Sequence, residues 1–396
     1  MRASRLGAVA TLALLAAWFP VASRASAASW QISALSQLQE LESNLALKEQ
    51  HLLQVRTGCA AGRAAEERGG RRIVRRAAFD VGSAACKIVV ADVDLHVGSV
   101  ANITRTIFSE RVAVSLCEDL AAGPGRKFSE RTLQELHEVL HEFKKRAEQQ
   151  GAEQFAGIAT AAFRKASNGA AFLQQLHKEG LPLRIISQER EAFLGFLTAN
   201  HLCPEIQAFD LVSWDCGGGS FQITAEVPPA WEAWMKSVGT GVAKTLLLTT
   251  VQKKKDVSAS PNPVTLLEAQ ALAKEIRTLI GEPPEWLTDK IRAPGVHFAA
   301  IGGETSLFRL ASELIDGTCI SKARLLEAIE NLCGKTDLQL RLMEDVPSAM
   351  KQPQSVIPKL VLLYAILNAL GCDEVSYYDT NGNTPGILMT EELWRK

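Results

Sequence analysis

Two short turns of the same kind, 135 positions apart, constrain the fold of this 396-residue chain more than any other feature. In each, an apolar run ends in Asp, crosses a glycine turn that ends in Ser, and continues as a second apolar run. Such a pattern predicts a β-hairpin. The first turn runs from Asp80 to Ser83 and the second from Asp215 to Ser220. Their repetition predicts two related halves, each with a glycine turn at the head of a hairpin.

The residues of both turns suit an oxyanion such as phosphate. Gly82 lets the backbone approach a ligand closely, and Ser83 offers a hydroxyl and an N–H group. The run Gly217, Gly218 and Gly219, which leads to Ser220, is of little use in packing but forms a nest of N–H groups. Either turn alone is compatible with an ordinary hairpin. The pair predicts a phosphate chain held between the halves.

An acidic residue precedes each glycine turn. Asp80 and Asp215 end the two apolar runs, so related halves would bring their carboxylates to one site. Carboxylates bind Mg²⁺ directly or through water. We therefore expect Asp80 and Asp215 to share a metal ion.

A third candidate region lies between the two turns. A strand-like run ends at Arg164, and a second short strand leads into a helix with Ser187 as its N-cap. Glu189 and Glu191 occupy the first turn of that helix, where acids are favoured by the helix dipole alone. The functional interpretation is that one carboxylate points into the cleft and takes a proton from water.

From about Ala77 onward the chain resembles the Ppx/GppA phosphatases, which comprise exopolyphosphatases and guanosine pentaphosphate phosphohydrolases of the actin-like ATPase superfamily. The resemblance covers about 310 of the 396 residues. Its motifs occur in the order of the family: Ala78–Ser83, Ala159–Arg164, Ile186–Ala192, Asp215–Ser220, Gly241–Lys244, a third glycine motif at Phe298–Thr305, and a late helix that begins near Val356.

The resemblance implies an α/β fold with two actin-like (ribonuclease H-like) domains flanking a central cleft. It implies that Glu191 is the catalytic base, and that Asp215 binds Mg²⁺ or orients water. Asp80 and Ser83 match the first phosphate loop, and Arg164 matches an arginine of a phosphate-binding loop. The implied activity is Mg²⁺-dependent hydrolysis of a terminal phosphoanhydride in polyphosphate or a nucleotide polyphosphate.

Several positions depart from the family pattern. Such changes indicate an altered substrate or a secreted member that binds a polyanion without cutting it; an actin-like kinase is a further alternative. A carboxylate at Glu304 is expected to repel phosphate. The departures are Ala84 and Ala85 for Asn-Ser, Cys216 for an aliphatic residue, Glu304 for a small residue, Lys359 for Gly, and Thr384-Pro385 for Arg-Glu.

The composition of the chain excludes other classes of protein. Charge is balanced, with 43 basic and 44 acidic residues, so no basic excess indicates a nucleic-acid partner. Eight cysteines are too few for a disulfide-built fold, and their pairing is left open. We expect no transmembrane helix after residue 21.

His137 and His141 are interpreted as part of a solvated helix face, and a homodimer is left open.

The N-terminal region is predicted to lie outside the catalytic body. Residues 1–27 have the three-part order of a cleaved secretory signal peptide, with a plastid or mitochondrial leader as the alternative. Residues 28–76 are predicted to form an amphipathic helix and an exposed basic linker, whose Arg75-Arg76 pair could also be a processing site. Actin-like domain I is predicted at 77–203 and domain II at 204–396, with the last helix packing back on domain I.

Overall fold

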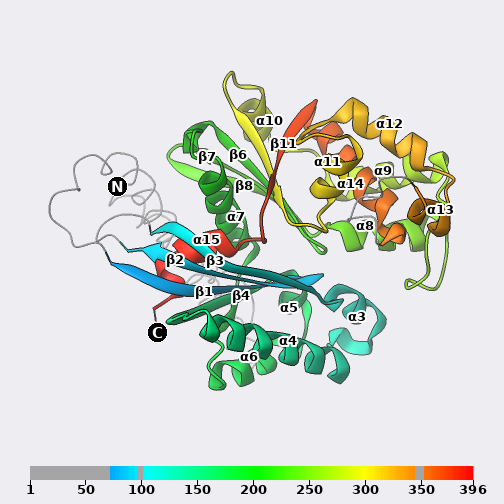
Figure 1. Cartoon of the computed structure of the whole chain (residues 1–396). Coiled ribbons are helices and arrows are strands. Elements are labelled where there is room, and N and C mark those ends of the chain that lie inside the picture. Colours follow the sequence, from blue (N-terminus) through cyan, green and yellow to red (C-terminus); the bar gives the residue numbers. More distant parts are fainter. Residues whose placement is uncertain (1–71, 96–100, 344–351, 396) are drawn as a thin grey trace, which may run out of the picture. The chain divides into compact units, whose positions relative to one another are not determined.

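The computed structural model describes residues 72–95, 101–343 and 352–395, which form two mixed β-sheets and the helices around them (Figure 1). The predicted signal peptide, amphipathic helix and linker through residue 71 lie outside the described residues. The first sheet has five strands in the order β3-β2-β1-β4-β5. These strands are β1 (Ile73–Val81), β2 (Ala85–Asp94), β3 (Asn102–Ala113), β4 (Gln154–Ala159) and β5 (Leu183–Ile185).

The second sheet has six strands in the order β10-β11-β9-β6-β7-β8. These strands are β6 (Leu211–Cys216), β7 (Phe221–Val227), β8 (Ala230–Lys236), β9 (His297–Gly302), β10 (Cys319–Ser321) and β11 (Glu374–Asp379). In both sheets a parallel pair lies beside an antiparallel hairpin: β1 pairs with β4 and β2, and β6 pairs with β9 and β7. Both predicted hairpins, β1–β2 and β6–β7, are thereby confirmed.

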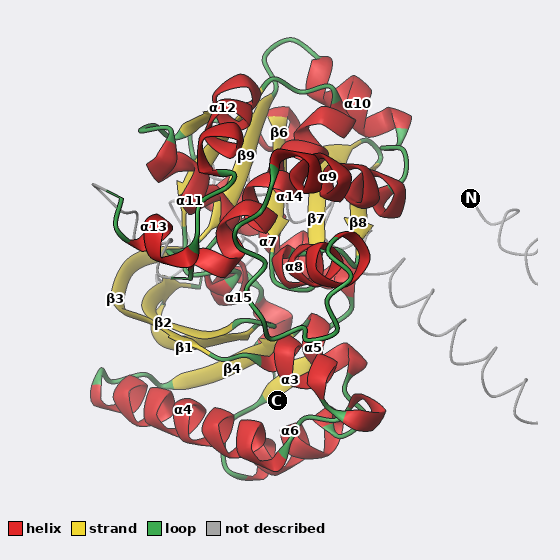
Figure 2. Cartoon of the chain, turned by 90° about the vertical axis from the view of Figure 1, so that its right-hand side faces the viewer, coloured by secondary structure: helices red, strands yellow, loops and turns green. Residues whose placement is uncertain are grey.

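Helices connect the strands and cover the sheets (Figure 2). The α-helices of the first part of the chain are α3 (Leu116–Ala122), α4 (Glu130–Gln149), α5 (Ala161–Lys165), α6 (Gly169–Lys178) and α7 (Gln188–Leu202). Those that follow are α8 (Thr240–Leu246), α9 (Leu266–Ile280), α10 (Glu285–Arg292), α11 (Leu307–Leu314), α12 (Lys322–Leu332), α13 (Asp337–Arg341), α14 (Val356–Leu370) and α15 (Thr384–Met389). Short 3₁₀ helices are η1 (Pro124–Arg126), η2 (Ala208–Asp210), η5 (Pro353–Ser355) and η6 (Glu391–Leu393), and η3 (Leu247–Val251) is a π-helix.

The central strand β1 is buried on both faces. Phe79 belongs to a core with Leu140 of α4, whereas the neighbouring Ala78 belongs to a core with Leu194 of α7 and Ile387 of α15. A strand covered on both sides needs apolar residues in succession, which explains the run Ala-Ala-Phe before the first turn. Helix α4 thus lies on one face of the first sheet, and α7 and α15 lie on the other.

Helix α7 packs against both sheets. Its Leu194 belongs to a core of the first sheet, while Phe196 and Ala199 belong to a core that includes β6 and β9 of the second. A helix with two sheets as neighbours must be apolar on more than one face, and residues 192–196 are Ala-Phe-Leu-Gly-Phe. The predicted domain I, residues 77–203, includes this helix, and the second apolar face of the helix packs on strands that are distant in the chain.

Helices α7 and α15 cross with their backbones in close contact. The N–H group of Gly386 donates a hydrogen bond of 3.0 Å to Oγ1 of Thr198. A Cβ atom at Gly386 would lie 2.3 Å from the carbonyl oxygen of Leu194. Only glycine permits this approach, which places the segment before α15 beside the heads of both hairpins (Figure 1).

The first strand begins at Ile73 rather than at Ala77, and this changes the interpretation of the basic linker. Arg76 is 1% exposed. Its Nε donates to Gln154 and its Nη1 donates to Glu391 at 2.6 Å, while Trp394 stacks on the guanidinium. Arg75 forms an ion pair with Asp92 across the hairpin. The Arg75-Arg76 pair is therefore part of the first sheet, and a solvated linker is wrong for these two residues.

The late helix α14 is a core helix. Residues 353–370 are long and apolar enough to cross a membrane by length and composition, which the sequence analysis did not expect, but 72% of this segment is buried in the protein. Lys359 is the buried cation of α14, and its ammonium group donates to the carbonyl oxygen of Thr305 at 2.8 Å. Burial, and secondarily the charge of Arg111, lowers the pKa of Lys359 to about 8.

Replacing Gly386 with Ala should destabilise the fold by about 1–3 kcal/mol, because the added methyl group would overlap the backbone of α7. Urea unfolding measured by circular dichroism tests this expectation. The control is Gly317→Ala, because no atom lies within 4 Å of a Cβ built there. Equal stability of the two variants would contradict the close crossing.

Replacing Lys359 with Met should stabilise the protein at pH 7 by about 1–3 kcal/mol, because the folded state binds the lysine proton more weakly than the unfolded state. The free-energy cost of burying the charged lysine is fully present below pH 8. It fades as the pH rises towards 10.5, the pKa of the lysine in the unfolded chain. The advantage of the variant should therefore shrink between pH 8 and pH 10. The measurement is urea unfolding across that pH range. The control is Lys322→Met, which replaces a partly exposed lysine. If Lys359→Met were less stable than the parent protein at pH 7, the hydrogen bond to Thr305 would outweigh the cost of the buried charge.

Candidate active site

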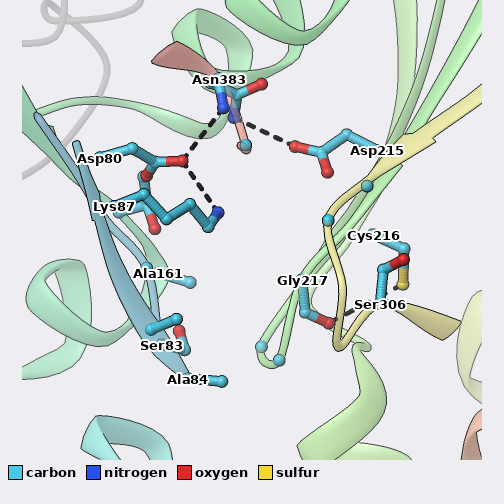
Figure 3. Close-up of a pocket in the computed structure, with 18 of the residues that line it drawn as sticks. Asp80, Ser83, Ala84, Lys87, Ala161, Asp215, Cys216, Gly217, Ser306 and Asn383 are labelled. Atoms are coloured by element: carbon cyan, nitrogen blue, oxygen red, sulfur yellow. Dashed lines mark hydrogen bonds and ion pairs between the residues drawn. The ribbon is translucent and has the colours of Figure 1, made fainter. Parts of the chain in front are cut away.

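A pocket lies where the two glycine turns face each other (Figure 3). Residues from both sheets line it, together with the third glycine turn and the segment that precedes α15. It brings together nearly all of the residues predicted from the sequence: Asp80, Gly82, Ser83, Glu191, Asp215, Gly217, Gly218, Gly219 and Ser220.

The two aspartates are linked by one residue. Asp80 accepts a hydrogen bond from the backbone N–H of Asn383 at 3.1 Å, and Asp215 accepts one from Nδ2 of the same residue at 3.1 Å (Figure 3). Lys87 donates to Asp80 at 3.0 Å. Asn383 directly precedes α15, so the crossing of α7 and α15 positions it between the acids.

Burial sets the electrostatics of these acids. Asp80 is 2% exposed, and the ion pair with Lys87 compensates its charge. Burial raises the pKa of Asp215, against the lowering effect of the charge of Lys87 and of the hydrogen bond from Asn383. Three carboxyl groups line the pocket, those of Asp80, Asp215 and Glu191, against the two cations Lys87 and Arg111, so the pocket can accept an additional cation.

The two glycine turns lie against each other. A Cβ at Gly219 would lie 3.2 Å from Oγ of Ser83, and one at Gly218 would lie 3.4 Å from Cβ of Ser83. The carbonyl oxygens of Gly217 and Gly218 accept hydrogen bonds from the start of α8, which fixes the second turn. In the described part of the chain, the N–H groups of Gly218 and Gly219 make no backbone hydrogen bond. They remain available to an anion.

Glu191 lies at the same pocket, on the first turn of α7. The α7 N-cap is Ser187, whose hydroxyl accepts from the N–H of Arg190, as the sequence predicted. Glu191 is 7% exposed. Burial raises the pKa of Glu191 to about 7, with the charge of Arg164 opposing this and the charges of Asp215 and Asp80 adding to it. Such a carboxyl group can accept a proton near neutral pH.

Arg164 differs from its predicted role. It does not line the pocket; its guanidinium donates to Oε2 of Glu191 at 2.8 Å and to the carbonyl oxygen of Ile186 at 3.0 Å. The predicted direct contact with phosphate is therefore replaced by a contact with the predicted base. Arg164 therefore fixes the position of Glu191, and its positive charge favours the ionised form of that carboxyl group.

The third glycine turn also differs from expectation. The side chain of Glu304 is exposed and does not line the pocket, so the predicted repulsion of phosphate by this residue is not supported by its position. Instead Arg111 of β3 lines the pocket and donates to the hydroxyl of Thr305. Burial lowers the pKa of Arg111, while the charges of Asp80 and Glu304 raise it.

Among the pocket residues that the sequence did not predict are Lys87, Arg111 and Asn383. Lys87 could have been found, because it stands opposite Asp80 in a hairpin whose register follows from the short turn. Arg111 comes from an edge strand and Asn383 lies 303 positions from Asp80, so no local pattern places either one.

The cysteines of the described residues are all free thiols. Cys216 lines the pocket but is 7% exposed, and burial raises the pKa of its thiol. It therefore behaves as a small core residue with little thiolate at neutral pH.

Comparisons with known proteins agree with this architecture. The sequence model of the Ppx/GppA phosphatase family matches residues 89–382. A solved family member from Aquifex aeolicus superposes with a TM-score of 0.58 at 20% identity, covering 81% of this chain and 98% of that one. An exopolyphosphatase from Cytophaga hutchinsonii gives a TM-score of 0.60 at 16% identity, covering 80% and 97%.

A search of curated protein sequences finds no match. The solved structures share the fold at low identity, which confirms the predicted α/β architecture of two actin-like domains. The family model covers most of the chain, from the middle of β2 to Gly382, and includes the second glycine-turn hairpin. On these grounds the chain belongs to the Ppx/GppA phosphatase family.

Proposed function

We propose that this chain hydrolyses the terminal phosphoanhydride bond of inorganic polyphosphate or of a guanosine pentaphosphate-type nucleotide, with Mg²⁺ as cofactor. The observation that carries the proposal is Glu191, a buried carboxyl group whose pKa is raised to about 7 and which faces a pocket lined by two glycine turns. A phosphatase needs a base of this kind, and a protein that only holds an anion does not.

In this reaction the terminal phosphoryl group lies against the N–H groups of Gly218 and Gly219 and the hydroxyl of Ser83. Glu191 takes a proton from water while the water oxygen bonds to phosphorus and the bridging P–O bond breaks. Arg164 holds Oε2 of Glu191, so we assign the proton transfer to Oε1. Phosphoryl transfer depends on positioning and charge neutralisation, which these groups supply.

The donors near the two aspartates fit Mg²⁺. Asp80 and Asp215 offer carboxylate oxygens, and Oδ1 of Asn383 is buried without a hydrogen-bond partner in the described part of the chain. All of these are oxygen ligands of the kind that Mg²⁺ prefers. When bound, the ion would neutralise phosphate charge, and Lys87 and Arg111 would add two further positive charges at the pocket.

One observation favours a second function, binding of a polyanion without hydrolysis. Ala84 and Ala85 line the pocket in place of the polar Asn-Ser of the family, so the first turn offers fewer hydrogen-bond donors to a phosphoryl group. Such a protein would bind polyphosphate through Lys87, Arg111 and the backbone, and would release no phosphate.

Glu191→Gln should lower phosphate release from long-chain polyphosphate by about 10²–10⁴-fold, because it removes the base and keeps the shape. The measurement is phosphate release by the full-length protein with Mg²⁺, on polyphosphate and on guanosine pentaphosphate in parallel. Glu189→Gln is the matched control, since Glu189 lies on the same helix turn but is exposed and outside the pocket.

Three outcomes are distinguishable. Release that collapses only in Glu191→Gln supports a hydrolase with this base, and the faster substrate identifies its class. Equal loss in both glutamate variants would contradict the assignment of Glu191. Tight binding of polyphosphate by the folded parent protein without release of phosphate would establish the binding function instead.

In a plot of the rate of phosphate release against pH, the acidic limb should rise with a midpoint near pH 7. The reason is that Glu191 must be ionised to act and its pKa is raised to about 7. Arg164→Gln should move that limb upward by roughly 1–3 pH units, since the positive charge of Arg164 favours the ionised form. The measurement is kcat/KM against pH, with the exposed Arg131→Gln as control. An unshifted limb in Arg164→Gln would mean that another group controls the profile.

A further inference from the structure

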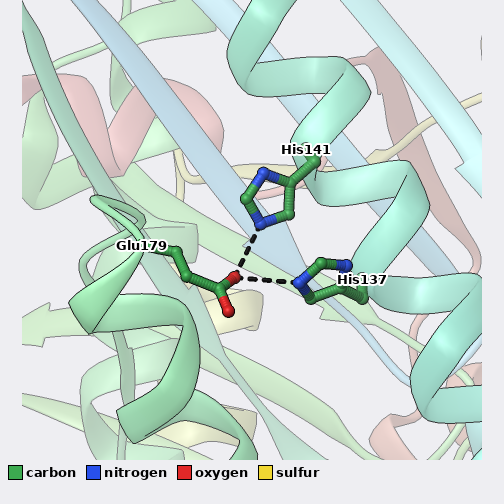
Figure 4. Close-up of side chains that lie close together, drawn as sticks. All are labelled: His137, His141 and Glu179. Carbon is green, nitrogen blue, oxygen red and sulfur yellow. Dashed lines mark hydrogen bonds and ion pairs between the residues drawn. The ribbon is translucent and has the colours of Figure 1, made fainter.

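A cluster of two histidines and a glutamate lies away from the pocket. His137 and His141 project from α4, and Glu179 caps the C-terminal end of α6 (Figure 4). Nε2 of His137 lies 2.9 Å from Oε2 of Glu179, and Nε2 of His141 lies 2.7 Å from the same oxygen. One ligand atom from each residue falls within 4.8 Å of the others.

The sequence contains the motif that explains this cluster. Residues 137–141 read His-Glu-Val-Leu-His, which is the H-E-x-x-H pattern. On a helix this spacing places both imidazoles on one face, where they can bind one metal ion. A solvated helix face is an incomplete interpretation of His137 and His141, because the carboxylate of Glu179 contacts both imidazoles from another helix.

We propose that His137, His141 and Glu179 form a binding site for a Zn²⁺-type transition-metal dication, separate from the phosphate pocket. The ligand atoms are Nε2 of both histidines and Oε2 of Glu179, and solvent supplies the fourth position. Two imidazoles and a carboxylate are a common Zn²⁺ donor set, whereas Mg²⁺ prefers oxygen donors alone.

The distances suit an ion at the centre of the cluster. With ligand bonds of about 2.0–2.1 Å, tetrahedral Zn²⁺ separates its ligand atoms by roughly 3.3 Å. The nitrogen-to-oxygen distances of 2.7 and 2.9 Å are shorter than this by about half an ångström. A small outward rotation of the carboxylate and the rings makes room for the ion without moving either helix.

The surroundings hold the ligands in place. Gln175, one turn before Glu179, donates to Oε1 at 3.0 Å and leaves Oε2 directed at the histidines. The backbone of Glu179 is fixed by N–H bonds to the last turn of α6. Leu136 and Leu140 anchor the buried face of α4 in the core of the first sheet. A hydrogen bond that orients a ligand side chain in this way is typical of metal sites.

The charges around the cluster are compatible with a cation. Glu179 supplies a carboxylate to the cluster. Lys144 lies one turn along α4 and is paired with Glu148. Lys145, Glu138 and Glu142 also line the hollow beside the histidines, so its formal charge is close to balanced.

We assign metal binding and no hydrolytic reaction to this site. Glu138, the residue that would act as a base in an H-E-x-x-H hydrolase, accepts a hydrogen bond from Gln134 at 2.8 Å on its own helix. The ligands are 29–36% exposed at the surface. The consequence of binding is a link between α4 and the end of α6, which should stabilise this face of the first sheet.

The test is Zn²⁺ titration of the chelator-treated full-length protein by calorimetry, with excess Mg²⁺ present to occupy sites of oxygen donors. The parent should bind one Zn²⁺ at this site and melt at a higher temperature with Zn²⁺ than without it. His141→Gln and Glu179→Gln should each lower the affinity at least about tenfold and remove the thermal shift. His177→Gln, an exposed histidine on α6 outside the cluster, is the matched control.

Co²⁺ substitution gives an independent readout, because tetrahedral nitrogen and oxygen ligation produces visible absorption bands that the two variants should lose. Circular dichroism without metal establishes that each variant is folded. Zn²⁺ binding that is unchanged in His141→Gln and Glu179→Gln, or absent from the folded parent, would overturn the proposal. Neither result depends on phosphate release, so the proposed phosphatase activity is tested separately.

Discussion

The close crossing of α7 and α15 is the contact on which the candidate site depends. Gly386 lets the two helix backbones touch, and this brings the start of α15 to the heads of both hairpins. Asn383 then reaches Asp80 with its backbone and Asp215 with its side chain. Glu191 lies on the first turn of the other crossing helix. A bulkier residue at the crossing would separate groups that come from four distant parts of the sequence.

Local patterns predicted the parts of the site that form from neighbouring residues. Both hairpins, the glycine turns and the N-cap of α7 depend on a few adjacent residues, and they occur where the sequence placed them. The position of Asn383 and the shared packing of α7 depend on contacts between segments far apart in the chain. Such contacts leave no periodic signal in the sequence, because either partner alone looks like an ordinary polar or apolar residue.

The contacts of the charged residues were the least predictable from sequence, because a residue type indicates a charge but not which neighbour its side chain contacts. Arg164 turns to Glu191 instead of the pocket, and Glu304 is exposed and does not line the pocket. Arg111, on an edge strand, and Lys87 supply positive charges that line the pocket. The sequence therefore indicates correctly that charges gather around the glycine turns, but packing decides which of them face a ligand and which tune another side chain.

The bonds of Arg76 bear on how the protein is made. Its ion pair with Glu391 joins residues 315 positions apart, and α15 covers a face of the first sheet that forms from the opening strands. During synthesis the first sheet leaves the ribosome long before its covering helix exists. A contact of such high sequence separation forms late and slows folding. The guanidinium of Arg76 and part of this sheet face therefore gain these partners only after residues 384–394 have been synthesised.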